Sequence, residues 1–191
     1  VKLMSYVSCV WYKWTYFVWF INGSIGAIGG RKIITQQPIN SVSHYSNYKD
    51  HHRILLLVVF GPIYECLLAD TGTNGHAPVG AIWGRNCLKA ILGCKESKSH
   101  LPSMTPLPMR SKPVLFVLTG DDAFGLTTCL MKPYPCTHLT MEQGILNYQL
   151  TWMQRISENG FGILANRWRV LQVPILLTPH FETNIVLAIL W

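Results

Sequence analysis

The uninterrupted apolar run Ile54-Leu-Leu-Leu-Val-Val-Phe60 restricts the fold of this chain more than any other segment. The run is followed by Gly61-Pro62, and its length and flanking residues are typical of a β-strand. Because both faces of the strand are apolar, it is expected at the centre of a sheet, with covering layers on both sides. At 191 residues, 49% of them apolar, the chain is long enough to form such layers within one domain.

Two further segments are expected to pair with this central strand. Ile63–Ala69 follows the Gly61-Pro62 turn, and residues 31–35 form a second candidate strand after the glycine-rich segment 22–30. Together the three strands predict an antiparallel meander, closed by turn residues at Asp70–Gly75. A later apolar run, Val114–Leu118, has the length of a buried strand and leads to Gly120-Asp121-Asp122.

The longest helical pattern lies in the second half of the chain. Thr140 and Gln143 have the spacing of a capping box, and apolar residues continue from Met141 toward Ile156. The pattern then passes into the segment 155–171, whose apolar positions predict a buried stripe made of Phe161, Leu164, Trp168 and Leu171. Glu158 precedes this stripe. Its carboxylate either faces the interior, where it needs a metal or a basic partner, or lies in a first helical turn and is favoured by the helix dipole.

The other segments carry weaker signals. A short helix is expected over Gly80–Leu92, a long exposed loop over Lys95–Lys112, and another buried element over Val173–Trp191. The aromatic segment 1–21 is expected to form a helix that packs on the core, because Lys13 interrupts it and no signal-peptide pattern is present. We therefore expect no membrane segment. Because the chain starts with Val1, it is expected to be a fragment or a processed product.

Charge and cysteine usage restrict the partners and the compartment. The net charge of +7 and a pI near 9.2 favour polyanionic partners such as nucleic acid or an anionic membrane surface. The six cysteines contain no C-x-x-C pair and no zinc-ligand spacing, which is typical of reduced thiols in an intracellular protein.

Asp121 and Glu158 are the acidic residues whose positions suggest a functional site. Asp121 follows a predicted buried strand, and carboxylates beyond the carboxyl end of such a strand lie where open sheets place their sites. Glu158 lies on a later helix, so the two could hold a divalent metal ion. The alternative is that Asp121 and Asp122 only cap a turn or a helix.

The chain resembles the DDE transposase-derived nucleases of the PIF/Harbinger group. Four blocks carry the resemblance in the family's order and spacing, namely Gly120-Asp-Asp-Ala-Phe-Gly-Leu126, Leu130-Met-Lys-Pro-Tyr-Pro135, Leu139-Thr140 with Asn147, and Glu158-Asn-Gly-Phe-Gly-Ile-Leu164 with Arg167-Trp-Arg-Val-Leu171. Further similarity upstream, including residues 25–33 and 69–75, extends it over nearly the whole chain.

The resemblance implies an α/β, ribonuclease-H-like fold, in which a mixed sheet combines an antiparallel three-strand meander with parallel strands and is flanked by helices. It implies a nuclease domain over residues 22–191, incomplete at both ends. In the family, three acidic residues hold two metal ions, usually Mg²⁺ or alternatively Mn²⁺, that drive phosphodiester cleavage and strand transfer. Asp121 matches the second acid and Glu158 the third, and Asp122 is an additional candidate ligand. The first acid is replaced by Gly29, and another family Asp by Val79.

The loss of the first acid predicts impaired or absent cleavage. The alternative is a non-catalytic remnant of a transposase that binds DNA or a protein. Candidate DNA contacts are basic residues whose other interpretation is a solvated surface: Lys49, Arg53, Arg155, Arg167 and Arg169. By resemblance, we expect a nuclear or otherwise cytoplasmic protein, with DNA and a separate Myb-like DNA-binding protein as partners. Asp70 is expected at the far end of the third strand and Gly29 before the first, so Asp70 is a poor replacement for the lost acid.

Overall fold

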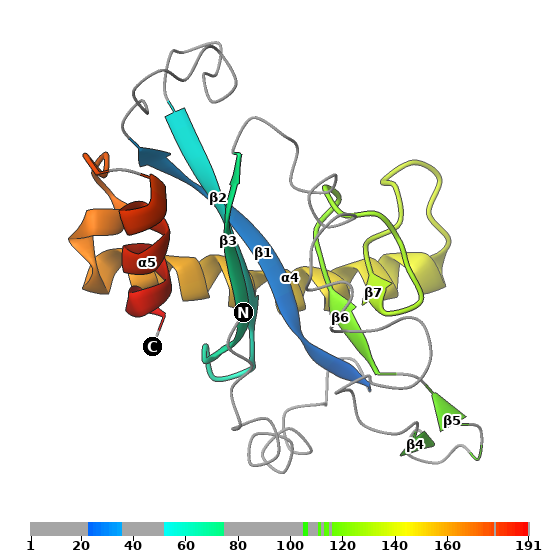
Figure 1. Cartoon of the computed structure of the whole chain (residues 1–191). Coiled ribbons are helices and arrows are strands. Elements are labelled where there is room, and N and C mark those ends of the chain that lie inside the picture. The colour runs from blue at the N-terminus through cyan, green and yellow to red at the C-terminus, as the bar shows by residue number, and fades with distance from the viewer. Residues whose placement is uncertain are drawn as a thin grey trace.

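The described part of the chain forms a mixed five-stranded sheet with two helices on one of its faces (Figure 1). The computed structural model describes residues 23–35, 52–74, 105–106, 111, 113–114, 116–177 and 179–190. Its elements are β1 (Ser24–Thr35), β2 (His52–Phe60), β3 (Cys66–Asn74), β4 (Thr105–Pro106), β5 (Pro113–Val114), β6 (Val117–Thr119), β7 (Leu130–Met131), the helix α4 (Met141–Arg167), the 3-10 turn η1 (Arg169–Leu171) and the helix α5 (Pro179–Ile189). No helix within these ranges is long and apolar enough to cross a membrane.

The sheet has the strand order β3-β2-β1-β6-β7. β1, β2 and β3 are successively antiparallel, whereas β1 and β6, and also β6 and β7, run parallel. The predicted α/β ribonuclease-H-like fold, with its antiparallel meander and parallel strands, is therefore confirmed. The small β4–β5 pair is separate from this sheet.

Alternate residues of the apolar run point to opposite faces of the sheet, as the pleat requires. On one face lies the helix-face cluster, defined by Ala27, Ile33, Ile54, Leu56, Val58, Phe60, Met153, Ile156, Phe161, Leu171, Ile175 and Val186. On the other lies the opposite-face cluster, defined by Ile25, Ile28, Leu55, Leu57, Val59, Leu118, Phe124 and Leu130. The strand apolar on both faces is thus internal to the sheet, as predicted.

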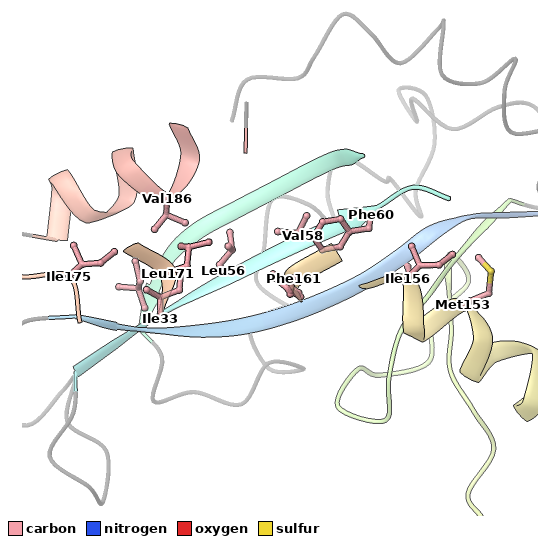
Figure 2. Packing of buried hydrophobic residues seen from close by; sticks show 12 residues of the cluster. Ile33, Leu56, Val58, Phe60, Met153, Ile156, Phe161, Leu171, Ile175 and Val186 are labelled. Atoms are coloured by element: carbon pink, nitrogen blue, oxygen red, sulfur yellow. The ribbon is translucent and has the colours of Figure 1, made fainter. Parts of the chain in front are cut away.

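α4 and α5 both pack on the face that carries the helix-face cluster. α4 crosses β1 and β2, while α5 packs near β3 at one end of the sheet (Figure 1). Figure 2 shows side chains of α4 and α5 pointing toward those of β1 and β2. The amide of Ile175 donates to the carbonyl of Ile34 at 3.0 Å, which attaches the segment before α5 to the end of β1.

Several predicted strand boundaries were wrong. β1 begins at Ser24 rather than at residue 31, so Gly29 lies inside the strand and pairs with Val58. The second hairpin strand begins at Cys66 rather than at Ile63, which belongs to the turn after β2. Asp70 was expected in a turn and instead lies within β3. Glycine in β1 and Asp, Thr and Gly in β3 weaken local strand propensity, and pairing with the strongly apolar β2 overrides it.

The segment before Asp121 also differs from its prediction. The run Val114–Leu118 is not one strand, because β5 ends at Val114 and β6 covers Val117–Thr119. The expected loop over residues 95–112 contains β4. The predicted elements at residues 1–21 and 80–92 lie outside the described residues, as do Lys49 and Val79.

α4 is one continuous helix, as the pattern predicted. At its start, the Gln143 amide donates to Oγ1 of Thr140 at 3.3 Å, and the Thr140 amide donates to Oε1 of Gln143 at 3.0 Å, so the predicted capping box is confirmed. At its end, Trp168 is the C-cap and is exposed, so its expected burial was wrong. Glu158 lies well inside the helix, and the interpretation that placed it in a first turn was also wrong.

The thiol of Cys66 provides a pH-dependent probe of this fold. Burial raises its pKa from 9.0 to about 12, because the thiolate loses hydration in the packed interior. The unfolded thiol ionises at lower pH than the folded one, so its contribution to stability is present below pH 9 and lost as pH rises toward 12. At pH 8 we expect iodoacetamide to modify the exposed Cys136 much faster than Cys66. Peptide mass spectrometry measures both rates, and equal rates in the folded protein would contradict the raised pKa.

Candidate functional site

Gly29 and Asp121 lie beside each other at the junction of β1 and β6. The parallel register pairs Ala27 with Thr119, and two further residues along each strand bring Gly29 level with Asp121. A Cβ on Gly120 would lie 3.2 Å from Cγ2 of Ile28, which confirms that the segment after β6 still follows β1 there. Adjacent strands are separated by about 4.8 Å, so a side chain at position 29 would be within reach of the Asp121 carboxylate.

Asp121 begins a tight turn at the carboxyl end of β6. Its Oδ1 accepts a hydrogen bond from the amide of Ala123 at 2.9 Å, and its carbonyl accepts one from the amide of Phe124 at 3.2 Å. The ring of Phe124 is buried in the opposite-face cluster and anchors the turn. Asp121 and Asp122 are both exposed. Asp121 therefore has the turn-forming role that was the alternative interpretation of this residue.

A side-chain hydrogen bond connects this turn to the middle of α4. Nε2 of Gln154 donates to the carbonyl of Gly120 at 3.1 Å. Glu158 follows Gln154 by four residues and therefore lies on the same side of the helix, one turn further along. Glu158 is exposed. The packing thus brings the segment that contains Asp121 to the same part of α4 as Glu158.

Gly29, the position at which the resemblance predicts the first acid, faces two buried side chains of α4. A Cβ added to Gly29 would lie 2.9 Å from Cε2 of Phe161, 3.0 Å from Cβ of Ser157 and 3.1 Å from its Oγ. The Phe161 ring is itself fixed by an edge-to-face contact with Phe60, with centroids 5.1 Å apart (Figure 2). Even a methyl group at position 29 therefore requires the helix side chains to move.

The donor set does not fit the two-ion centre that the family resemblance implies. Two divalent cations about 4 Å apart repel each other and require bridging carboxylate charge, which Gly29 cannot supply. Within the described ranges, no group of three or more His, Cys, Asp or Glu side chains could hold a metal ion. Asp121 and Glu158 alone therefore do not supply the carboxylates that such a centre would need.

Asp70 does not replace the missing acid, although its expected position was wrong. It lies inside β3 and pairs with Leu57, which in turn pairs with Gly30. Asp70, Leu57 and Gly30 therefore lie side by side across three neighbouring strands. Asp70 is thus not far from Gly29 along the strand direction. However, Leu57 belongs to the opposite-face cluster, whereas α4 with Glu158 covers the other face. The sheet itself therefore lies between Asp70 and Glu158.

Four of the candidate DNA-binding residues lie in the described ranges, and one of them lies near Glu158. Arg155 lies on α4, three residues before Glu158, and is exposed. Arg167 ends α4, about 14 Å along the axis from Glu158 at 1.5 Å per helical residue, and Arg169 lies beyond the end of α4 in η1. Arg53 pairs with Ile34 at the far end of β1.

The structure also brings residues to the site that the sequence patterns did not single out. Besides Gln154 and Ser157, Arg31 reaches it from β1, where its Nη1 donates to the carbonyl of Phe161 at 3.3 Å. Asn159 of α4 donates to the hydroxyl of Tyr64 in the turn after β2, at 3.4 Å. Gln154 could have been found as the residue one helical turn before Glu158, whereas the Arg31 contact depends on the packing of β1 against α4.

Comparison with known proteins agrees with this arrangement. The sequence model of a family described as DDE superfamily endonuclease matches residues 28–191, a range that contains Gly29, Asp121 and Glu158. No curated protein and no solved structure matches the chain. The match covers most of the chain, and the fold is the one that the family resemblance implied. The chain therefore belongs to the DDE superfamily endonuclease family.

Proposed function

We propose that this chain is a transposase-derived nuclease domain that still associates with DNA but has lost most or all of its cleavage activity. The single observation that supports the proposal is that Phe161 and Ser157 fill the space in front of Gly29, where the resemblance predicts the first acid. Family membership supports DNA as the ancestral substrate. The net charge of +7 supports continued binding to a polyanion.

Finer features of the proposal follow from the sequence resemblance. We assign the chain to the PIF/Harbinger group on its four sequence blocks, and the ancestral ion is Mg²⁺ or Mn²⁺, for which Asp121 and Glu158, with Asp122 as an additional candidate, are the remaining ligands. A Myb-like DNA-binding protein and a nuclear location belong to the same proposal.

A plasmid-nicking assay in Mg²⁺ or Mn²⁺ tests the impairment. We expect no metal-dependent nicking above background, because the remaining carboxylates provide too little charge to hold two ions. Glu158→Ala is the site variant, and Glu142→Ala is its matched control, since Glu142 is an exposed acid of α4 in the first turn. Robust cleavage that Glu158→Ala abolishes and Glu142→Ala preserves would show that the domain is an active nuclease.

DNA association is measured separately by the salt dependence of the Kd for a labelled duplex. If phosphate contacts dominate, the affinity falls steeply as salt rises from about 50 to 200 mM. Binding that is absent, or that does not change with salt, would contradict the DNA-associating part of the proposal while leaving the cleavage result to stand alone.

A further inference from the structure

The outward face of α4 carries aromatic side chains that the sheet does not cover. Tyr148 is 63% exposed and Trp152 41% exposed, and Arg155 follows them on the same side of the helix. The steps of four and three residues place the three side chains in one row along the helix surface. We call Tyr148, Trp152 and Arg155 the aromatic row.

The side chains of the aromatic row contact one another. The rings of Tyr148 and Trp152 lie edge to face, with centroids 6.2 Å apart and an interplanar angle of 74°. The guanidinium carbon of Arg155 lies 4.9 Å from the centroid of the Trp152 ring, which is within cation–π distance. These contacts restrict the motion of the exposed rings, so a flat ligand that stacks on them loses less conformational freedom on binding.

The aromatic row leads directly to the pair of Asp121 and Glu158. Glu158 follows Arg155 by three residues, so the row Tyr148, Trp152, Arg155 continues along the helix surface to Glu158. A nucleic-acid strand that passes Asp121 and Glu158 along α4 would therefore lie over Arg155 and the two rings. Figure 1 shows α4 extending past β1 and β6, where this site is formed.

The part of α4 between Glu142 and Glu158 has one charged side chain, the cationic Arg155, and no acidic residue. Single-stranded nucleic acids are held by this combination of side chains, since unpaired bases stack on aromatic rings while cations contact the phosphates. The exposed aliphatic residues Met141 and Ile145 lie further along the helix, away from Glu158, and are not needed for such a contact.

We propose that the aromatic row is a stacking platform for unpaired bases of a DNA strand that lies beside the Asp121 and Glu158 pair. The proposal rests on the proposed function, because it assumes that DNA is the ligand of this site. It adds the form of the ligand, a single-stranded or locally unpaired segment, and the residues that hold it. Trp152 is its central element, since it contacts both of the other members of the row.

Fluorescence anisotropy with a labelled oligo-thymidine and with a duplex of equal length tests the proposal on the full chain. Base stacking on one aromatic residue is worth about 1–3 kcal/mol, so Trp152→Leu is expected to weaken single-strand binding by about 5- to 150-fold. Trp152→Phe keeps a stacking ring and is expected to retain most of the affinity. Duplex binding should change less in either variant, because paired bases do not present their faces.

Two control variants separate stacking from general effects on surface and charge. Phe181→Ala removes another exposed aromatic ring, on α5, and Lys32→Ala removes one exposed positive charge, on β1. Both are expected to leave single-strand affinity nearly unchanged. Circular dichroism and urea unfolding of each variant establish that the fold is retained, and the comparison of Trp152→Phe with Trp152→Leu excludes a loss of fold as the cause.

The outcomes distinguish this proposal from the function on which it rests. If the wild-type chain binds DNA and Trp152→Leu binds it equally well, the stacking platform is wrong while DNA association stands. If the wild-type chain binds neither DNA form, both proposals fail. If Trp152→Leu instead changes the molar mass measured by light scattering and leaves single-strand affinity intact, the row is a protein interface and the stacking proposal is overturned.

Discussion

Gly29→Asp is expected to destabilise the domain by about 3 kcal/mol or more and to leave metal-dependent cleavage at background. The new Cβ would lie 2.9 Å from the Phe161 ring and 3.0 Å from Cβ of Ser157, both of which are buried. Overpacking of a well-filled core costs about 1–3 kcal/mol, and burial of a carboxylate without full hydrogen bonding adds to that cost. Urea unfolding and the nicking assay measure the two effects on the same preparation.

Gly125→Asp is the matched control for this substitution. It introduces the same side chain close to Asp121, but Gly125 is exposed and a Cβ there would meet nothing within 4 Å. We expect its free energy of unfolding to stay within about 0.5 kcal/mol of wild type, as is usual for open surface positions. The difference in free energy of unfolding between Gly29→Asp and Gly125→Asp therefore measures the cost of placing a side chain against Phe161 and Ser157.

A double-mutant cycle tests the physical cause. If the Phe161 ring closes the position, Gly29→Asp combined with Phe161→Leu will lose less stability than the sum of the two single losses, because the smaller side chain leaves room for the new carboxylate. A different outcome would contradict this physical cause. If Gly29→Asp alone is stabilised by Mg²⁺ or Mn²⁺ and restores nicking, then position 29 is open and lacks only its ligand.

Gly160→Ala is expected to destabilise the domain by about 1–3 kcal/mol, despite the higher helix propensity of alanine. Gly160 is buried on α4, and a Cβ there would lie 2.7 Å from Cδ1 and Cε1 of Phe60. The Phe60 ring cannot easily retreat, because it is 1% exposed and packs edge to face on Phe161. The measurement is the free energy of unfolding by urea.

The same substitution two residues further along the helix should have the opposite sign. Gly162 is exposed, and an added Cβ would meet nothing within 4 Å, so Gly162→Ala gains helix propensity of about 1 kcal/mol without a clash. A loss of stability in Gly162→Ala, or a gain in Gly160→Ala, would contradict the close packing of α4 against Phe60. Phe60→Leu in the Gly160→Ala background should recover part of the loss if the ring is the obstacle.

Much of the fold could be predicted from the sequence where a pattern was strong and local. The apolar run identified an internal strand, and Thr140 with Gln143 identified the start of α4. Weak patterns failed where pairing decides the structure. β1 includes the glycine-rich segment before residue 31, and β3 extends past Asp70 through turn-forming residues, because β2 provides a long hydrogen-bonding partner on each side.

The candidate site was predictable as a set of positions and not as a packed arrangement. The motif blocks predicted Asp121 and Glu158 as site residues and Gly29 at the position of a first acid, and they depend only on residue identity and order. The environment of Glu158 was misjudged, because its place in the middle of α4 and its exposure depend on where the helix begins and what it covers. The Gln154 hydrogen bond to Gly120 joins elements that are distant in sequence.

The sequence by itself determined the fold class and the family, because apolar pattern, motif order and residue identity are properties of the chain. The tertiary structure decided the surroundings of the positions that the motifs single out. Only the packing of α4 on β1 places Phe161 and Ser157 into the space beside Gly29, and only the sheet separates Asp70 from Glu158. The steric contacts at Gly29 and the face of the sheet on which Asp70 lies depend on segments that are far apart along the chain, so no local sequence pattern predicts them.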